Sequence, residues 1–472
     1  MKIKSLFAAF LFVTIGNAAD LAWRYQLLEG SYLMDDCLIC GRPSFNIPMR
    51  GSFTLRRVEV SPVATKYVIE NADFKAGPDY SFSGSGTYTT SGDFVIKQSM
   101  TLSGELQTTA ETKQVALTNE TSAITRRWPM LFATLKQTNG TLASTITLTI
   151  AAAPLQEIWF STSTNFTRAI KIDNSVSDGD LLSTIGHIVK RNSDFQTNFP
   201  GPTFLNMGLD AVDILPGAEI AFSTGTKGVL SDGDFAFANT GAITRWQDFM
   251  NIVAPDLTSD PGLDALQFDG PNKIYFSTRQ DIAAAVGPIG NGDIILIDTE
   301  AGTGDVFRSN ADLLSQFHPS EAKDYGLDAL YIWPTGEIWF STTNDFSDTQ
   351  LGPISAGDLL SDAGYIVYRN AGLIAALQPV GAPPPDVGLD ALVVISDFVA
   401  DESKTTLKAS LDTQNDAVIL SWQGQGRVFR LERARDIAGP WEGITSIVPA
   451  FSFEDTDNIT QQQRAFYRVR QW

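Results

Sequence analysis

Short runs of alternating apolar and polar residues recur through the middle of the chain at an interval of about sixty residues. One run reads Glu-Ile-Trp-Phe-Ser-Thr or a close variant, and its four copies begin at Glu157, Glu219, Lys273 and Glu337. A second run reads Gly-Leu-Asp-Ala followed by Leu or Val, and its copies begin at Gly208, Gly262, Gly326 and Gly388. Alternation of period two over such short stretches predicts β-strands rather than helices.

Two further patterns keep the same interval. A Gly-Asp turn leads into a short apolar run, and the four turns begin at Asp178, Asp232, Asn291 and Ala356. A closing strand follows each turn, and these strands end at Asn192, Trp246, Asn310 and Asn370. Four short strands per repeat, in a fixed order, are typical of a β-propeller blade. The sequence therefore predicts a small β-propeller over residues 154–398.

The two ends of the repeat array are unequal. The first repeat begins at Glu157–Thr162 without a preceding Gly-Leu-Asp-Ala strand, and the last such strand, Gly388–Ile395, stands alone. We expect this last strand to complete the first blade, which gives a closed ring of four blades without open sheet edges. Two alternatives remain: the repeats form an open stack, or Ser144–Ile150 completes the first blade and Gly388–Ile395 begins a fifth.

The regions on either side of the repeats also alternate. Residues 20–153 contain runs such as Gly51–Val60 between Gly, Ser and Pro residues, which predicts a β-sandwich or an open barrel. Within it, Ser81–Thr90 places small polar residues on one face, which fits either a sugar-stacking surface or a plain solvated sheet. Residues 402–472 predict a second small sandwich with Trp422 in its core. The whole chain is therefore expected to be all-β.

The charge and the first residues limit the function. The chain has 54 acidic and 34 basic residues, a formal net charge of −20. Phosphate binding needs clustered Lys and Arg, so nucleic acids and anionic membranes are poor partners, whereas a cation-rich partner or a divalent metal is compatible. Residues 1–19 combine two lysines, an apolar run and small residues, as a secretory signal does. We expect a secreted protein, either extracellular, periplasmic or at the cell surface, and no later stretch is apolar enough to span a bilayer.

Cys37 and Cys40 are the two cysteines of the chain. In an exported protein this pair predicts a disulfide that closes a tight loop. A zinc site is an alternative, but tetrahedral zinc needs four ligands, and the two histidines, His187 and His318, are far away in the sequence. A redox-active Cys-x-x-Cys pair is the other alternative, although such pairs usually open a helix.

The repeated aspartates are the candidate metal ligands. The Gly-Leu-Asp-Ala motif supplies Asp210, Asp264, Asp328 and Asp390. If they surround an axis, their carboxylates would hold a hard cation such as calcium; otherwise each accepts hydrogen bonds from turn amides. The Gly-Asp turns supply a second set, Asp180, Asp234, Asp293 and Asp358. Their spacing is too short for an EF-hand loop, so a β-turn explains them without a metal.

Common catalytic motifs are absent from the sequence. There is no Gly-x-Ser-x-Gly elbow, no His-Glu-x-x-His and no phosphate-binding glycine loop. His187 lies in a predicted strand and His318 precedes Pro319, so neither suggests a Ser-His-Asp triad, and both are expected to be ordinary surface residues. We therefore predict no catalytic residue.

Three resemblances add to this reading. The Gly-Leu-Asp-Ala and Glu-Ile-Trp-Phe phrases resemble the repeat of hemopexin-type propellers, which implies four blades and an ion in the channel, although the repeat length differs and a bridging disulfide is lacking. The whole repeat is similar to those of many exported bacterial proteins. The alternating C-terminal strands resemble a fibronectin type III-like module that ends exported proteins of the Verrucomicrobia, with Tyr467 in the place of its corner tyrosine. These resemblances imply an extracellular modular protein.

Three functions remain compatible with the sequence. The first is a non-enzymatic binding or surface protein whose propeller face contacts glycan or protein, which predicts partly exposed indoles at Trp159, Trp246, Trp333 and Trp339. The second is a structural envelope or matrix component, which predicts a large apolar patch and no pocket. The third is a polysaccharide hydrolase or lyase, which predicts a deep pocket with two carboxylates from unequal blades.

Overall fold

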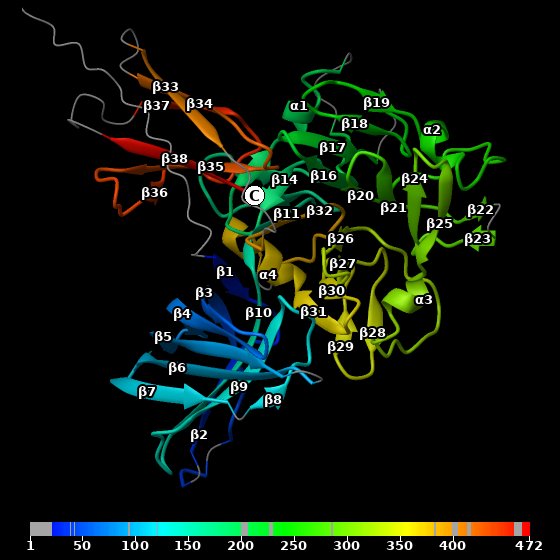
Figure 1. Ribbon diagram of the computed structural model, residues 1–472. Coiled ribbons are helices and arrows are strands. Elements are labelled where there is room, and N and C mark those ends of the chain that lie inside the picture. The colour runs from blue at the N-terminus through cyan, green and yellow to red at the C-terminus, as the bar shows by residue number, and fades with distance from the viewer. Residues whose placement is uncertain are drawn as a thin grey trace, which may run out of the picture. The chain divides into compact units, whose positions relative to one another are not determined.

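A computed structural model gives the fold of the chain (Figure 1). It describes residues 21–37, 39–41, 43–92, 95–119, 121–199, 206–225, 230–284, 287–381, 384–398, 405–412, 417–456 and 465–472. The predicted signal, residues 1–19, lies outside these ranges. The described residues are all-β, with many antiparallel sheets and a few one-turn helices. No helix among them is long and apolar enough to cross a membrane.

The chain divides into two compact units. One contains Leu21–Asp213 and Ile220–Phe398, and the other contains Val399–Trp472 with the short segment Ile214–Glu219. The predicted N-terminal region and most of the predicted repeat region therefore belong to one unit.

The N-terminal region forms one ten-stranded antiparallel sheet. Its strands are β1 (Ala22–Leu27), β2 (Tyr32–Asp36), β3 (Ile47–Val60), β4 (Ala64–Ala76), β5 (Tyr80–Ser91), β6 (Lys97–Thr108), β7 (Thr112–Thr118), β8 (Ser122–Ala123), β9 (Leu131–Gln137) and β10 (Thr145–Ala153). Large side chains alternate along them, so that Tyr25, Phe53 and Phe74 meet in one buried core. A disulfide joins Cys37 and Cys40, whose Cα atoms are 5.4 Å apart, just after β2.

The repeats form four four-stranded antiparallel sheets, which we number I to IV along the chain. Sheet I contains β11 (Leu155–Phe160), β14 (Leu181–Ser183), β15 (Ile188–Lys190) and β32 (Leu392–Ser396). Sheet II contains β16 (Ala211–Leu215), β17 (Glu219–Ser223), β18 (Phe235–Phe237) and β19 (Ile243–Thr244). Sheet III contains β20 (Ala265–Asp269), β21 (Lys273–Ser277), β24 (Ile294–Asp298) and β25 (Thr303–Arg308). Sheet IV contains β26 (Leu330–Ile332), β27 (Ile338–Phe340), β30 (Leu359–Ser361) and β31 (Tyr365–Tyr368).

Smaller elements lie between these strands. Each sheet is followed by a short helix: α1 (Asn192–Phe195), α2 (Trp246–Met250), α3 (Asn310–Leu313) and α4 (Asn370–Ile374). Two-stranded ribbons are formed by β12 (Phe166–Thr167) with β13 (Ser175–Val176), β22 (Ile282–Ala284) with β23 (Gly287–Ile289), and β28 (Phe346–Asp348) with β29 (Gly352–Ile354). In Figure 1, β16, β20, β26 and β32 lie toward the middle of the four sheets.

The last repeat strand returns to the first sheet. β32 pairs with β11, with Val393 opposite Trp159 and Leu392 opposite Phe160. The predicted pairing of the last Gly-Leu-Asp-Ala strand with the first repeat is thus confirmed. The alternative in which Ser144–Ile150 completes the first sheet is wrong, because these residues belong to β10 and pair with β2 and β9.

A repeated hydrogen bond links each sheet to the next. The serine of each Phe-Ser-Thr sequence is fully buried and donates its hydroxyl to the carbonyl of the leucine in the next Gly-Leu-Asp-Ala motif. The four bonds are Ser161 to Leu209 (2.5 Å), Ser223 to Leu263 (3.4 Å), Ser277 to Leu327 (3.3 Å) and Ser341 to Leu389 (2.8 Å). Leu389 leads into β32 of sheet I, so the fourth bond returns to the beginning. The four sheets therefore form a closed series, and the open-stack alternative is wrong.

The ten-stranded sheet packs against sheets I and IV within the same unit. The guanidinium carbon of Arg126, from the segment before β9, lies 3.8 Å from the ring centre of Tyr365 in β31. The Tyr368 hydroxyl donates to the carbonyl of Leu27 at 3.3 Å. Backbone pairing continues this contact, since the amide of Glu29 donates to Val367 O at 2.9 Å.

The C-terminal residues form two three-stranded sheets. One contains β33 (Thr406–Asp412), β34 (Ala417–Gln423) and β37 (Ser452–Asp455), and the other contains β35 (Phe429–Ala434), β36 (Glu442–Gly443) and β38 (Phe466–Gln471). Trp422 is buried 6.1 Å from Phe429, measured between ring centres, as expected for a core tryptophan. The Tyr467 hydroxyl donates to the carboxylate of Asp455 at 2.8 Å, whereas a corner tyrosine bonds to backbone.

Candidate functional site

The four Gly-Leu-Asp-Ala motifs bring their aspartates to a common centre. We call Asp210, Asp264, Asp328 and Asp390 the aspartate ring. Burial raises the pKa of the Asp328 carboxyl, and the charges of the other three ring aspartates raise it further. The four carboxylates therefore act on one another electrostatically, and the shared contact with Arg279 places Asp210 and Asp264 beside each other. Asp210 and Asp264 are buried, whereas Asp328 and Asp390 are partly exposed.

The glycine that begins each motif makes room for this arrangement. Gly326 and Gly388 have φ of 73° and 75°, in the left-handed region that favours glycine. A Cβ atom on Gly326 would lie 2.3 Å from Oγ1 of Thr343, and one on Gly388 would lie 2.0 Å from Oγ of Ser163. The glycines therefore let the residue after Phe-Ser-Thr approach the ring.

That residue differs in every repeat and decides how each aspartate is held. Ser163 donates its hydroxyl to Asp390, and Thr343 donates to Asp328 at 3.0 Å. The third repeat has Arg279 instead, whose Nε donates to Asp264 at 3.1 Å and whose Nη2 reaches Asp210 of the second repeat. A single guanidinium therefore bridges two of the four carboxylates.

The second repeat leaves space for this arginine. Its residue after Phe-Ser-Thr is Gly225, and a Cβ atom there would lie 2.8 Å from Oδ1 of Asp210 and 3.2 Å from Nη2 of Arg279. Any larger side chain at Gly225 would therefore compete with the Asp210–Arg279 ion pair. Burial lowers the pKa of the Arg279 guanidinium, but the charges of Asp210 and Asp264 beside it raise that pKa by more. Arg279 therefore stays protonated.

The aspartate ring thus has two unlike halves. Among the residues that the structure describes, Asp210 and Asp264 form ion pairs with Arg279, whereas Asp328 and Asp390 accept hydroxyl hydrogen bonds and form no ion pair, although the charge of Arg279 also lowers the pKa of Asp390. Burial is the main reason why the pKa of Asp390 is raised to about 6. At neutral pH this carboxyl is therefore mostly ionised but costly to keep so, which makes the uncompensated half a place where a cation would be favourable.

Calcium fits this ring poorly. Arg279 lies between Asp210 and Asp264, and a central ion would have to displace or adjoin its guanidinium. Among the residues that the structure describes, no three His, Cys, Asp or Glu side chains gather closely enough to hold a metal ion. The predicted calcium site at the four aspartates stays a prediction, and it has no support from this geometry.

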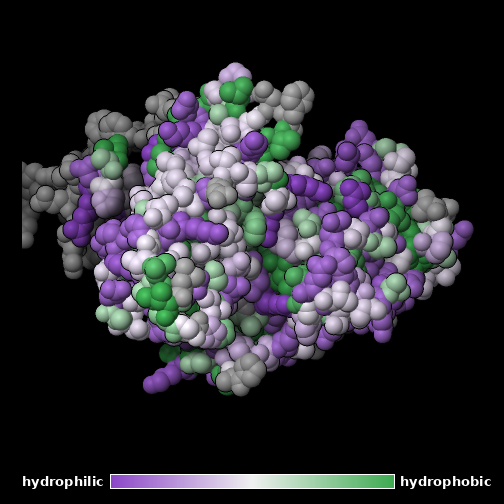
Figure 2. Space-filling view, turned by 90° about the horizontal axis from the view of Figure 1, so that it is seen from below, coloured by the Kyte–Doolittle hydropathy of each residue, from purple (hydrophilic) through white to green (hydrophobic). Residues whose placement is uncertain are grey.

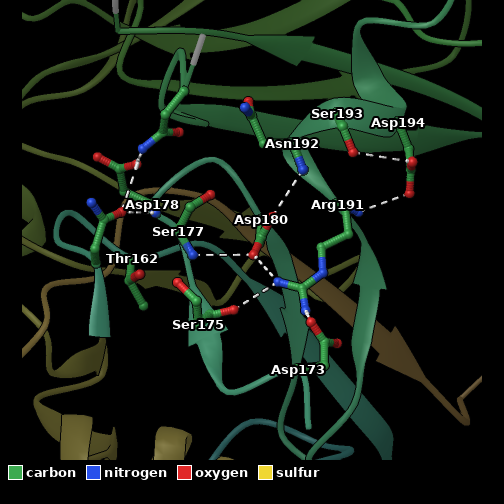
Figure 3. A network of polar contacts seen from close by, with 12 residues as sticks. Thr162, Asp173, Ser175, Ser177, Asp178, Asp180, Arg191, Asn192, Ser193 and Asp194 are labelled. Carbon is green, nitrogen blue, oxygen red and sulfur yellow. Dashed lines mark hydrogen bonds and ion pairs between the residues drawn. The ribbon is translucent and has the colours of Figure 1, made fainter. Parts of the chain in front are cut away.

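The aspartates of the Gly-Asp turns have a different role. Figure 3 shows Asp180 at the centre of a polar network. Its carboxylate accepts from the amides of Ser177 (3.1 Å) and Asn192 (2.9 Å) and pairs with Arg191 (2.7 Å). Asp234 and Asp358 make the same contacts in sheets II and IV, and Asp293 keeps only the two amides. These side chains fasten each turn to the following helix, as the turn interpretation expects.

A further set of repeated side chains was not identified from the sequence. The residue two positions before each motif glycine accepts a hydrogen bond from the amide of that glycine, and the four residues are Asn206, Asp260, Asp324 and Asp386. Just before sheet IV, for example, Asp324 accepts from Gly326 N at 2.8 Å and from Gly292 N, in the turn before β24 of sheet III, at 3.2 Å. The signal was present in the sequence as Asn or Asp, one variable residue, then Gly-Leu-Asp.

The expectation of exposed tryptophans is wrong. Trp159, Trp246, Trp333 and Trp339 are all buried, and none is more than 7% exposed. Trp159 and Trp339 lie on β11 and β27, the second strand of their sheets, where every residue of the strand is buried. Such strands are covered on both faces, so neither of the two sets of alternating side chains along them is exposed to solvent.

The two histidines lie in unlike surroundings. His318 lies beside Gln350, with their side-chain nitrogens 3.2 Å apart, and is exposed there. His187 is partly buried rather than a plain surface residue, and burial lowers the pKa of its imidazole. Two broad surface depressions lie elsewhere, of about 730 Å³ beside Glu70 and Asp73 and of about 360 Å³ beside Asp345 and Asp386. The second is also lined by Asp358, which pairs with Arg369, and it joins residues of the sheet IV repeat to Asp386, which precedes the last Gly-Leu-Asp-Ala motif.

Comparison with protein families, with curated proteins and with solved structures finds no match for this chain. The function must therefore be argued from the geometry of the aspartate ring and its surroundings.

Proposed function

We propose that the four sheets are the blades of a four-bladed β-propeller, and that the protein is an exported, non-enzymatic binding protein. Its aspartate ring engages a cationic side chain, lysine or arginine, of a partner protein. The observation that carries this proposal is the asymmetry of the ring: Arg279 bridges Asp210 and Asp264, while Asp328 and Asp390 have no cation among the described residues.

Arg279 serves as an internal example of the ligand. Its guanidinium donates through two nitrogens to carboxylates of two neighbouring repeats, the geometry that makes arginine well suited to acidic sites. The sheets repeat around the ring, so Asp328 and Asp390 offer a second pair of neighbouring carboxylates. Their partial exposure lets a side chain from outside reach them, in contrast to the buried Asp210 and Asp264.

The ionised carboxylates of the aspartate ring destabilise the fold, and this supports a binding function for the ring. Burial and neighbouring carboxylates raise the pKa of Asp328 and Asp390, so ionised carboxylates here weaken the fold at neutral pH. Groups with strongly perturbed pKa values gather at functional sites more often than elsewhere.

A protein partner is favoured over a glycan. Glycan binding at the propeller face would rely on exposed aromatic rings, and the four tryptophans expected to supply them are buried. A structural matrix protein would present a large apolar patch, whereas the face shown in Figure 2 carries its hydrophobic residues as separate small patches among hydrophilic ones. In the second depression described above, Asp358 pairs with Arg369 and Asp386 accepts from the Gly388 amide, so both carboxylates already hold the turns in place.

Export and the C-terminal module complete the proposal. The signal-like residues 1–19 and the Cys37–Cys40 disulfide are both consistent with an oxidising compartment. We take the C-terminal pair of sheets as a fibronectin type III-like module that acts as a spacer, in line with its resemblance to such modules in exported bacterial proteins.

Calorimetric titration of the mature protein with a tri-arginine peptide tests this proposal, with a tri-glutamine peptide as the control ligand. We expect tri-arginine to bind, and the double variant Asp328→Asn/Asp390→Asn to weaken that binding at least tenfold. The matched control Glu300→Gln/Asp305→Asn removes two exposed carboxylates outside the ring and should bind as the parent does. Equal weakening in both variants, or no binding to the parent protein, would refute the proposal.

A further inference from the structure

The aspartate ring contains the same arrangement twice, once with a guanidinium and once without. Each half has two carboxylates from neighbouring repeats and the two residues that follow the corresponding Phe-Ser-Thr sequences. The filled half consists of Asp210 and Asp264, with Gly225 and Arg279. The open half consists of Asp328 and Asp390, with Thr343 and Ser163. Every residue of both halves lies in the described part of the chain.

In the filled half, one arginine crosses from its own repeat to the preceding one. Arg279 Nε donates to Asp264 of the same repeat at 3.1 Å, and Nη2 pairs with Asp210 of the repeat before. Gly225 leaves room for this crossing, because a Cβ atom there would lie 3.2 Å from Nη2. Two different nitrogens of a single guanidinium therefore hold two carboxylates.

The open half has the two carboxylates without the guanidinium. The Ser163 hydroxyl donates to Oδ1 of Asp390, and the Thr343 hydroxyl donates to Oδ1 of Asp328. Among the described residues, no group donates a hydrogen bond to Oδ2 of either aspartate. Both aspartates are partly exposed, so these two oxygens are accessible to a side chain from outside.

A guanidinium suits two such oxygens better than an ammonium group does. Arginine presents its N–H donors as a planar fork that can reach two carboxylates at once, whereas lysine is a compact point charge. The ring carboxylates are not gathered around one point, since no three His, Cys, Asp or Glu side chains in the described ranges come close enough to hold a metal ion. A cation that is itself spread out, as Arg279 is, matches this arrangement.

We propose that the open half selects arginine over lysine, and that a guanidinium of the partner bridges Asp390 and Asp328 as Arg279 bridges Asp264 and Asp210. This inference rests on the proposed function, since it names which cationic side chain the aspartate ring takes. The repeat also defines the place that the guanidinium occupies. Ser163 stands in the position of Arg279 and reaches only Asp390, so the partner supplies the group that spans to Asp328.

Calorimetric titration of the mature protein at pH 7.5 with tri-arginine and tri-lysine peptides tests the selectivity. The peptides carry the same number of cationic side chains, so general attraction to the net charge of −20 affects both alike. We expect tri-arginine to bind at least tenfold more tightly, and Asp328→Asn/Asp390→Asn to remove most of this preference. Equal affinity would overturn the inference and leave the proposed function standing. Failure of both peptides to bind would refute the proposed function, and the inference with it.

Transfer of the filled arrangement to the open half tests where the ligand binds. Ser163→Arg/Thr343→Gly copies the Arg279 and Gly225 pair into sheets I and IV. This variant should bind tri-arginine at least tenfold more weakly than the parent, because its own guanidinium bridges Asp390 and Asp328. The matched control Ser410→Arg adds the same charge at an exposed position outside the ring and should bind as the parent does. A folded double variant that binds as tightly as the parent would overturn the inference.

Small cations give a readout that needs neither peptide nor the double variant. Arg279→Ala empties the filled half, so both carboxylate pairs then lack a guanidinium. Ethylguanidinium should raise the melting temperature of Arg279→Ala by more than ethylammonium does at the same concentration, because it takes the place of the missing group. Equal shifts with the two ions would overturn the selectivity for guanidinium.

Discussion

Replacing Asp390 by Asn tests the electrostatics of the aspartate ring most sharply. Burial raises the pKa of this carboxyl from the ordinary 3.8 to about 6, with the charge of Asp264 adding to the effect. The unfolded chain therefore releases the proton near pH 4, whereas the native protein holds it to about pH 6. Between these values the native state binds more protons, so the free energy of unfolding falls as the pH rises.

The size of the effect follows from the two pKa values. A difference of about two units, at about 1.4 kcal/mol each, gives an upper limit of about 3 kcal/mol lost between pH 4 and pH 7. Asn cannot ionise, yet its amide oxygen can still accept the hydroxyl of Ser163. We expect Asp390→Asn to be more stable than the parent at pH 7.5 by about 1–3 kcal/mol, and to match it near pH 4.

Urea unfolding followed by tryptophan fluorescence is the assay, because Trp159, Trp333 and Trp339 are buried within the ring of sheets and report on it. Asp305→Asn, at an exposed position, is the control and should leave the pH dependence unchanged. A variant that is less stable than the parent at pH 7.5, or that keeps the full pH dependence, would show that the Asp390 carboxyl does not have the raised pKa on which the aspartate ring depends.

Three further predictions concern the links within the ring. Arg279→Ala should destabilise the protein by about 1–3 kcal/mol at pH 7.5, a figure reduced from that of a fully buried pair because the arginine is 39% exposed. Burial raises the pKa of Asp210 and Asp264, so the loss should shrink as the pH falls and these carboxylates take up protons. Urea unfolding over a series of decreasing pH values checks this, and a loss that does not shrink would contradict it. In thermal-shift assays calcium should not raise the melting temperature of the parent protein, whereas a rise with calcium that a chelator reverses would support the ion-binding ring after all. Ser341→Ala leaves the buried Leu389 carbonyl without its donor and should cost about 1–2 kcal/mol in urea unfolding, while the exposed Ser410→Ala should cost almost nothing.

The sequence was sufficient to predict the closed series of sheets. The recurring motifs show where each repeat begins and ends. The missing strand before Glu157 and the extra one at Gly388–Ile395 therefore indicated that the last strand completes the first sheet. Period-two alternation also identified the strands. It could not show that strands such as β27 are covered on both faces, because that depends on how sheets stack, and so the tryptophans were expected in the wrong place.

The site was predicted only in part. The Gly-Leu-Asp-Ala motif identified the four aspartates. The residue that follows Phe-Ser-Thr was overlooked because it differs from repeat to repeat. Arg279 and Gly225 stand at the one position after Phe-Ser-Thr that changes in every copy, and their relation is a contact between neighbouring repeats. The role of a residue that departs from the repeat, such as Arg279, becomes clear only when the structure shows which residue of the neighbouring repeat it contacts.

Cross-linking of β11 to β32 tests the closed ring most directly. Ile158 and Val394 stand opposite each other across these strands, and Cys substitutes well for buried aliphatic residues. After oxidation of Ile158→Cys/Val394→Cys, peptide mapping should show a bond between residues 158 and 394 in a monomeric protein, and Ile158→Cys/Leu148→Cys should form none. A bond between 158 and 148, or failure of 158 to join 394, would contradict the ring and every statement about its centre.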